Sequence, residues 1–299
     1  MLLEATIIGG KYIHDMMKSD KLEQQAVDKT IRSLDKLSKA QAERNAAKER
    51  MNQEVIRFGN RKRGILFSSM QQFVDLYKRI IKINFSKKEE AAIFKNFSVI
   101  EQSEMELNIK MVQKDIKTPG PTKNVVAGCL VGGVGGLSGG IRNVSLGASN
   151  IAAMGAGAFV GAVSSSIVDD SKRKLEMANI EAKRARMLAI QNNSIELAYD
   201  AITQRVTRMT DVLTKLNVMF VKSIHNTEKI IDKNGVDKRN YSKADREQLA
   251  TCIDLAVTIK KFIDAPIVDE EGKVTKKSDE VLMLGNTCIN QVNETLNQI

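Results

Sequence analysis

The side chains that most often carry catalysis or bind metal ions are few in this sequence. It contains two histidines, His14 and His225, and three cysteines, Cys129, Cys252 and Cys288, with no Cys-x-x-Cys spacing. A zinc site needs three or four ligands at short spacings, and a nucleophilic triad needs a base beside its Ser or Cys. A phosphate-binding G-x-x-x-x-G-K-[ST] loop does not occur either. We therefore expect no enzyme activity, metal or cofactor, although residues distant in sequence can still meet in a fold.

A basic cluster is the second group of residues that could do chemistry. Arg57, Arg61, Lys62 and Arg63 follow one another closely, within residues 1–123 that hold 24 Lys and Arg against 16 Asp and Glu. Such cations can contact phosphate on an anionic lipid surface or on nucleic acid. Aromatic residues that would stack nucleic-acid bases are not interleaved with them, so nucleic acid is not expected as a partner. We favour a charged junction between helices and keep contact with an anionic surface as the alternative.

The segment that departs most from the rest of the chain is residues 124–168. Its only charged residue is Arg142, whereas 27% of the whole chain is charged, and 11 of the 19 glycines lie between positions 128 and 161. Small residues recur there every four positions, which on a helix places them on one face that another backbone can approach closely. These small residues are Gly128, Gly132, Gly136 and Gly140 in the first half, and Ser149, Ala153, Gly157, Gly161 and Ser165 in the second.

Two such ridges in succession predict a helical hairpin with its tip at Arg142 and Asn143. Its arms, residues 124–141 and 143–168, are close to the roughly 20 residues of a membrane span, and both flanks are basic. Each interior glycine costs a helix in water about 1 kcal/mol, so the arms need neighbouring helices or hydrocarbon around them. We favour a membrane-inserting hairpin. A buried hairpin in a soluble bundle and a loop without fixed structure are the alternatives.

The rest of the chain predicts long helices. The clearest pattern alternates apolar steps of four and three residues, which is the heptad seam of a coiled coil and requires a partner helix. One helix from Ser171 to about Ile231, roughly 90 Å long, would carry it. We expect the partner to be the helix of residues 15–58, returning antiparallel, although a second copy of the same helix fits as well. The seam consists of Ile195, Tyr199, Ile202, Val206, Met209, Leu213, Leu216 and Phe220.

Local signals indicate where these helices begin and end. The glycines of residues 59–64 predict a break or kink after the first helix, and Gly235 predicts a C-terminal cap. Ser86 and Glu89 match a capping box, in which each residue's side chain satisfies the other's backbone. Residues 267–274 carry the one non-helical pattern, which predicts a small β-hairpin around a glycine turn.

Together these features predict an all-α fold. We expect an elongated antiparallel helical bundle or coiled coil with a central glycine-rich apolar hairpin and at most one small β-hairpin. The chain divides into a basic N-terminal helical half (1–123), the apolar hairpin (124–168) and a C-terminal helical half (169–299), and the two halves form one bundle.

This layout of long helices, a heptad seam and an uncharged hairpin between two helical halves resembles the α-helical pore-forming toxins. That family includes cytolysin A and the haemolysin BL and Nhe components. The resemblance implies an apolar element that packs against the bundle in a soluble form and enters a bilayer as oligomers assemble. It also implies helix contacts within the inserted hairpin that are lined by Gly128, Gly132, Gly136, Gly140, Gly157 and Gly161.

We therefore expect a pore-forming or membrane-perturbing protein without catalytic function. Its partners would be a lipid membrane and either copies of itself or a second helical component. The alternatives are a non-lytic, membrane-anchored coiled-coil scaffold and a soluble helical adaptor whose glycine-zipper hairpin is buried. The N-terminal residues lack the basic region of a secretory signal. The soluble form is accordingly expected in the cytoplasm, or exported by another route, and at a membrane when active.

Overall fold

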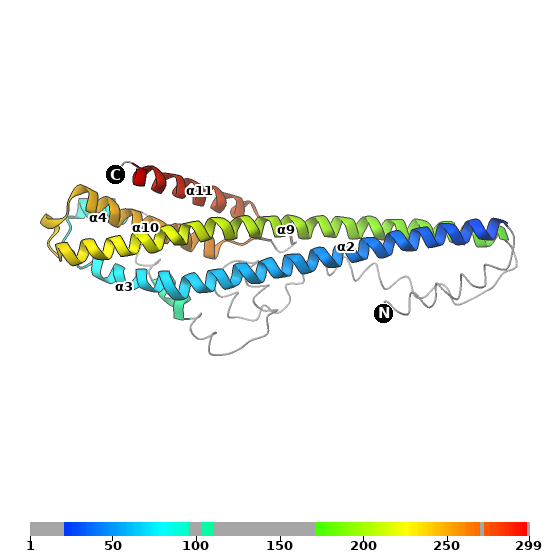
Figure 1. Cartoon of the computed structure of the whole chain (residues 1–299), viewed down its shortest axis with the longest axis horizontal. Coiled ribbons are helices and arrows are strands. Elements are labelled where there is room, and N and C mark those ends of the chain that lie inside the picture. The colour runs from blue at the N-terminus through cyan, green and yellow to red at the C-terminus, as the bar shows by residue number, and fades with distance from the viewer. Residues whose placement is uncertain (1–20, 96–102, 111–170, 270–271, 298–299) are drawn as a thin grey trace. The chain divides into compact units, whose positions relative to one another are not determined.

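The protein is helical throughout the part that the computed structural model describes, namely residues 21–95, 103–110, 171–269 and 272–297 (Figure 1). Only short connections interrupt the helices, so the all-α fold predicted from the sequence is confirmed for these residues. The predicted hairpin of residues 124–168 lies outside them. The elements are α2 (Lys21–Ile65), a π-helical turn (Leu66–Met70), α3 (Gln71–Ile80), α4 (Lys87–Ile93), α9 (Ser171–Asn234), a 3-10 turn (Lys238–Asn240), α10 (Lys243–Asp264) and α11 (Lys276–Asn297).

The chain forms two compact units that each combine an N-terminal and a C-terminal stretch. The first unit contains Met1–Met51 and Ser145–Asp200, and the second contains Asn52–Val144 and Ala201–Ile299. Both α2 and α9 contribute to each unit, so a division at the middle of the sequence does not describe the packing.

In the first unit, α2 and α9 pack side by side and run in the same direction. Polar pairs join them in a constant register, because the partner's number rises with the residue's own: Lys29 Nζ lies 2.9 Å from Asn179 Oδ1, and an Arg50 guanidinium nitrogen lies 3.1 Å from Asp200 Oδ1. The helix expected from the sequence is thus the partner of the seam, but the pairing is parallel rather than antiparallel. A heptad seam requires a covering helix without specifying its direction, and residues 66–170 supply the long connection that a parallel pair needs.

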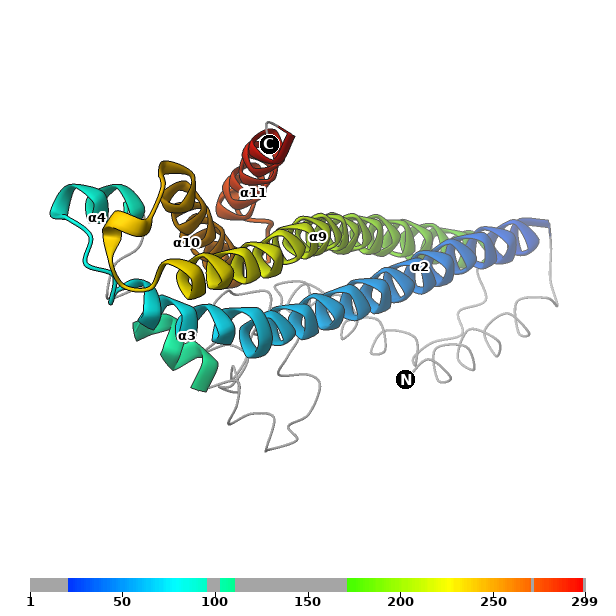
Figure 2. The ribbon, with the colours of Figure 1, turned by 60° about the vertical axis from the view of Figure 1, so that its left-hand side comes forward.

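The second unit gathers more helices around the remainder of α9. Ser69 Oγ donates to Asn217 Oδ1 at 2.6 Å and Arg79 pairs with Asp232, so the π-helical turn and α3 also run parallel to α9. α10 returns antiparallel after the turn that follows α9, and α4, α10 and α11 lie around the C-terminal part of α9 (Figures 1 and 2). The largest fully buried side chains of this unit are Phe58, Lys62, Ile65, Leu66, Met70, Phe73, Leu76, Ile80, Met105, Phe220 and Phe262.

α11 approaches its neighbours closely at Gly285. A Cβ atom built on this glycine would lie 2.5 Å from the Phe262 ring and 2.7 Å from Cγ1 of Val212. Ordinary carbon contacts are about 3.5–4.0 Å. The missing side chain is therefore what allows α11 to pack against both α9 and α10.

The helix ends follow most of the local signals. The capping box of Ser86 and Glu89 opens α4, and Gly235, at φ 65°, ends α9 with its N–H donated to the Ile231 carbonyl. No break occurs at residues 59–64, because α2 continues to Ile65; a π-helical turn, a common position for a helix kink, follows it directly. The small β-hairpin is present as a single antiparallel bridge between residues 268 and 274.

Candidate functional site: a cationic cleft

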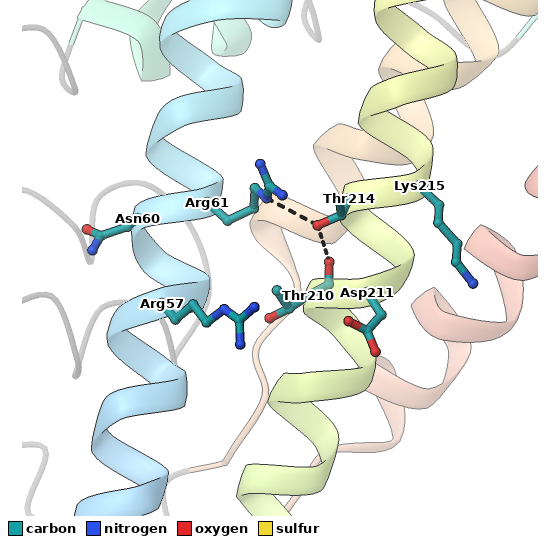
Figure 3. Close-up of a pocket in the computed structure, with 7 residues that line it drawn as sticks. All are labelled: Arg57, Asn60, Arg61, Thr210, Asp211, Thr214 and Lys215. Atoms are coloured by element: carbon teal, nitrogen blue, oxygen red, sulfur yellow. Dashed lines mark hydrogen bonds between the residues drawn. The ribbon is translucent and has the colours of Figure 1, made fainter.

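A cleft of about 580 Å³ opens between α2 and α9 in the second unit (Figure 3). Arg57, Asn60 and Arg61 share one face of α2 because they are three and four positions apart. The same spacing brings four α9 residues to the facing surface. The α9 residues that line the cleft are Thr210, Asp211, Thr214 and Lys215.

The two arginines of the cleft are held differently: a hydrogen bond fixes Arg61, whereas Arg57 extends between the helices. The Nε of Arg61 donates to Thr214 Oγ1 at 3.1 Å, and that hydroxyl donates to the Thr210 carbonyl at 2.7 Å. The guanidinium of Arg57 reaches between the helices towards Thr210, whereas Lys215 extends away from α2 (Figure 3). Arg57 also lies 3.7 Å from a carboxylate oxygen of Glu54, a neighbour on its own helix.

The charge of the cleft favours an anionic ligand. Three cations and the single carboxylate of Asp211 give its lining a net charge of +2. Guanidinium groups present a planar set of donors that matches phosphate, whereas the hydroxyl hydrogens of Thr210 and Thr214 are already donated to backbone carbonyls of α9. The Arg57 side chain is 72% exposed, so a ligand on a large surface could reach it. The cleft can thus hold a phosphate-type group.

Two members of the predicted basic cluster do not belong to this surface. Lys62 is 1% exposed, its Nζ donates to the Ile263 carbonyl at 2.8 Å, and it lies 4.6 Å from the Phe58 ring centroid. Ile263 is the second-last residue of α10, so the ammonium group meets the carbonyl end of a helix, where a cation is favourable. The expectation that Lys62 contacts an anionic surface is therefore wrong. Arg63 is half-buried beside it.

The sequence contains a signal that explains the burial of Lys62. It stands four positions after Phe58 and three before Ile65, on the same stripe as Met51 and Val55, and all four of these apolar residues are at most 2% exposed. The heptad pattern of α2 therefore assigns Lys62 to the core, whereas its neighbours in the Arg-Lys-Arg triplet suggest a surface.

All eight residues of the seam on α9 are buried, each at most 7% exposed. Phe220 contacts Phe73, with ring centroids 5.5 Å apart, and burial raises the pKa of Tyr199. These residues pack α9 against its neighbours, so they form the structural frame of the cleft and do not line it.

The thiols are poor candidates for chemistry. Burial raises the pKa of Cys252 to about 12 and raises that of Cys288, so both remain protonated at neutral pH.

His225 is exposed on α9. Within the described residues, no group of three or more His, Cys, Asp and Glu side chains could hold a metal ion. His14 and Cys129 lie outside the described residues.

The residues predicted to insert into or pack within a membrane also lie outside the described part of the chain. They include the hairpin tip, Arg142 and Asn143. Among the helices that the structure does describe, none combines the length and the apolar character needed to cross a bilayer. The small residues concerned are Gly128, Gly132, Gly136, Gly140, Ala153, Gly157 and Gly161.

The sequence analysis missed a second apolar surface, on α9 in the first unit. Several large side chains there are exposed although they lie within a helix that is otherwise charged or packed. These side chains recur with the heptad spacing of the buried seam, but they are shifted by two positions along the chain. These residues are Met177, Ile180, Met187, Ile190 and Leu197.

Comparisons with known proteins give no family for this chain. No protein-family model, no curated protein and no solved structure matches it.

Proposed function

We propose that this protein is membrane-active and acts without catalysis, by inserting residues 124–168 into a bilayer so that the bilayer is perforated or perturbed. The observation that carries the proposal is the composition of this segment, which holds one charged residue between two strongly charged helical halves. Its small residues at four-residue spacing would let two helical arms pack closely where no water competes for backbone hydrogen bonds.

Insertion and binding to the membrane surface would be carried out by different parts of the chain. We assign insertion to the neutral segment because it holds a single charged residue. The cationic cleft, with Arg57 and Arg61 at its edge, supplies contacts for anionic headgroups. A Lys or Arg near an anionic membrane surface contributes about 1 kcal/mol to binding, so two guanidinium groups would strengthen adsorption measurably.

Dye release from liposomes tests the insertion step. We expect the full chain to release a trapped dye and Val160→Asp to abolish release, because a carboxylate at the middle of a span costs about 3 kcal/mol. Val218→Asp is the matched control, since Val218 is 66% exposed on α9 and should tolerate the same charge. Equal release by the Val160→Asp and Val218→Asp variants would contradict insertion of residues 124–168.

A second experiment tests the cleft separately. The double variant Arg57→Gln, Arg61→Gln should bind anionic vesicles about 30-fold more weakly and leave binding to neutral vesicles unchanged. The double variant Lys39→Gln, Lys243→Gln removes the same charge from side chains that are 77% and 92% exposed elsewhere. If both double variants lose equal affinity, the effect is one of net charge and the cleft has no specific role.

A non-lytic scaffold is the second candidate function. The exposed apolar residues of α9 in the first unit favour it, because they offer a surface for assembly that a perforating segment does not need. Vesicle binding without dye release would identify the protein as such a membrane-anchored scaffold. An absence of vesicle binding under all lipid compositions would instead leave a soluble helical adaptor.

A further inference from the structure

α9 carries a second heptad seam on the face opposite its contact with α2. Ile180, Met187, Ile190 and Leu197 are between 51% and 70% exposed, and we call these four residues the back stripe. With the exposed Lys183 and Ser194 included, the steps between positions are three, four, three, four and three. Such alternation is the pattern of a helix that is covered by another helix.

The two faces of α9 are clearly separate. Each back-stripe residue stands two positions after a residue of the buried side; Leu197, for example, follows Ile195, which is 7% exposed. Two residues on a helix are about 200° apart, so the stripe points away from α2. Sequence periodicity and exposure thus agree that this face fits one further helix.

We infer that the back stripe is a homodimer contact, in which two copies of the chain pack α9 against α9 in antiparallel orientation. The two-fold axis would pass between Leu188 and Ala189. In this register Met187 faces Ile190 of the second copy and Ile180 faces Leu197 of the second copy. All four exposed apolar side chains of each copy then meet an apolar side chain, and Lys183 meets the hydroxyl of Ser194.

Repulsion between basic side chains favours antiparallel over parallel packing of the two α9 helices. Lys183, Arg184 and Arg186 form a basic cluster beside the stripe. A parallel dimer would set six of these cations at one level and would place Lys183 opposite its own copy. In the antiparallel dimer the centres of the two clusters are about eight residues, or about 12 Å, apart along the axis, so the cations repel one another less than in the parallel dimer.

The apolar area of the back stripe is large enough for a weak contact with a second copy of the chain. The exposed part of each of the four side chains is about 100 Å², and burial of the stripes with their flanking stems would remove on the order of 1,000 Å² in total, the lower end for a specific interface. We therefore expect a dissociation constant in the micromolar range. The dimer is independent of residues 124–168 and needs no lipid.

Analytical ultracentrifugation of the full chain without lipid tests the dimer. The wild type should change from one chain to two between about 1 and 100 µM, and Leu197→Glu should raise the dissociation constant at least 100-fold because an unpaired charge would be buried at the contact. Val218→Glu is the control, since Val218 is exposed on the same helix outside the stripe and should leave the dimer intact. A wild type that stays monomeric throughout would overturn the inference and leave the stripe to other residues of the chain or to a lipid surface.

Disulfide trapping tests the direction. In a Cys129→Ser background, where the two remaining native thiols are buried, Met187→Cys and Ile190→Cys chains are prepared separately and then mixed. The antiparallel dimer predicts that oxidation links a Met187→Cys chain to an Ile190→Cys chain more efficiently than it links two identical chains. Efficient self-linking of the Met187→Cys chain would instead indicate a parallel dimer and overturn the proposed register. Neither readout involves a membrane, so the dimer can fail while the proposed membrane function stands, and the reverse.

Discussion

Replacing Gly285 by alanine should destabilise the fold even though alanine is the better helix former. The new Cβ would lie 2.5 and 2.6 Å from two ring carbons of Phe262 and 2.7 Å from Cγ1 of Val212, so these neighbours would have to retreat by about 1 Å to reach an ordinary contact. Phe262 is fully buried and Val212 is 8% exposed, which leaves little room for that movement.

The expected size follows from two opposing effects. Overpacking a core costs about 1–3 kcal/mol, whereas Gly→Ala within a helix gains about 1 kcal/mol. We therefore expect Gly285→Ala to lower the free energy of unfolding by up to about 2 kcal/mol. Urea denaturation followed by far-UV circular dichroism measures this as a lower midpoint at unchanged slope.

Gly64 provides the matched control within the same unit. It lies in α2, it is exposed, and a Cβ built on it meets nothing within 4 Å. Gly64→Ala should therefore raise the free energy of unfolding by about 0.5–1 kcal/mol. Phe262→Leu should relieve part of the Gly285→Ala cost in a double-mutant cycle. If Gly285→Ala and Gly64→Ala stabilise the protein equally, the close packing of α11 is refuted.

Three further predictions follow from local geometry. Gly235→Ala should lower the free energy of unfolding by about 1 kcal/mol in the same urea assay, because the φ of 65° is strained for any residue with a Cβ. Hydrogen bonds from Ser86 lower the pKa of Glu89 to about 2, so its ionised form stabilises the protein at neutral pH and this contribution is lost as the pH falls from about 4.5 through 2. Glu89→Gln should flatten the curve of stability against pH in that interval. In Cys129→Ser protein, Cys252 and Cys288 should react with a thiol reagent only as fast as the fold opens, and fast labelling of the native protein would show that they are accessible.

The sequence pattern identifies which faces of the helices are covered but not the direction of the covering helix. The eight seam residues of α9 are all buried, as their periodicity requires, and the caps at Ser86 and Gly235 lie where local chemistry places them. These features depend on neighbours within one or two turns. Parallel pairing of α2 with α9 depends on contacts such as Arg50 with Asp200, which are 150 positions apart, and no local rule predicts them.

The basic cluster shows the same limit for a functional site. Arg61 and Lys62 are adjacent in sequence, yet one is exposed at the cleft and the other is fully buried. Neighbouring residues on a helix differ in direction by 100°, so a run of like charges in the sequence does not by itself define one surface. The apolar periodicity of α2 distinguishes the buried Lys62 from the exposed Arg61, whereas the charge of the two side chains does not.

α9 then explains why binding, assembly and insertion should be separable in this protein. One face of the helix is covered by α2, the face bearing the back stripe is open in the first unit, and the cleft with Arg57 and Arg61 borders α9 in the second. All of these surfaces are formed by described residues outside 124–168, and none of the described helices has the length and apolar character needed to cross a bilayer. Variants of the stripe should therefore alter the mass of the protein in solution, variants of the cleft its affinity for anionic vesicles, and variants of residues 124–168 the release of dye. A variant at any one surface that altered all three measurements alike would indicate a loss of the fold instead.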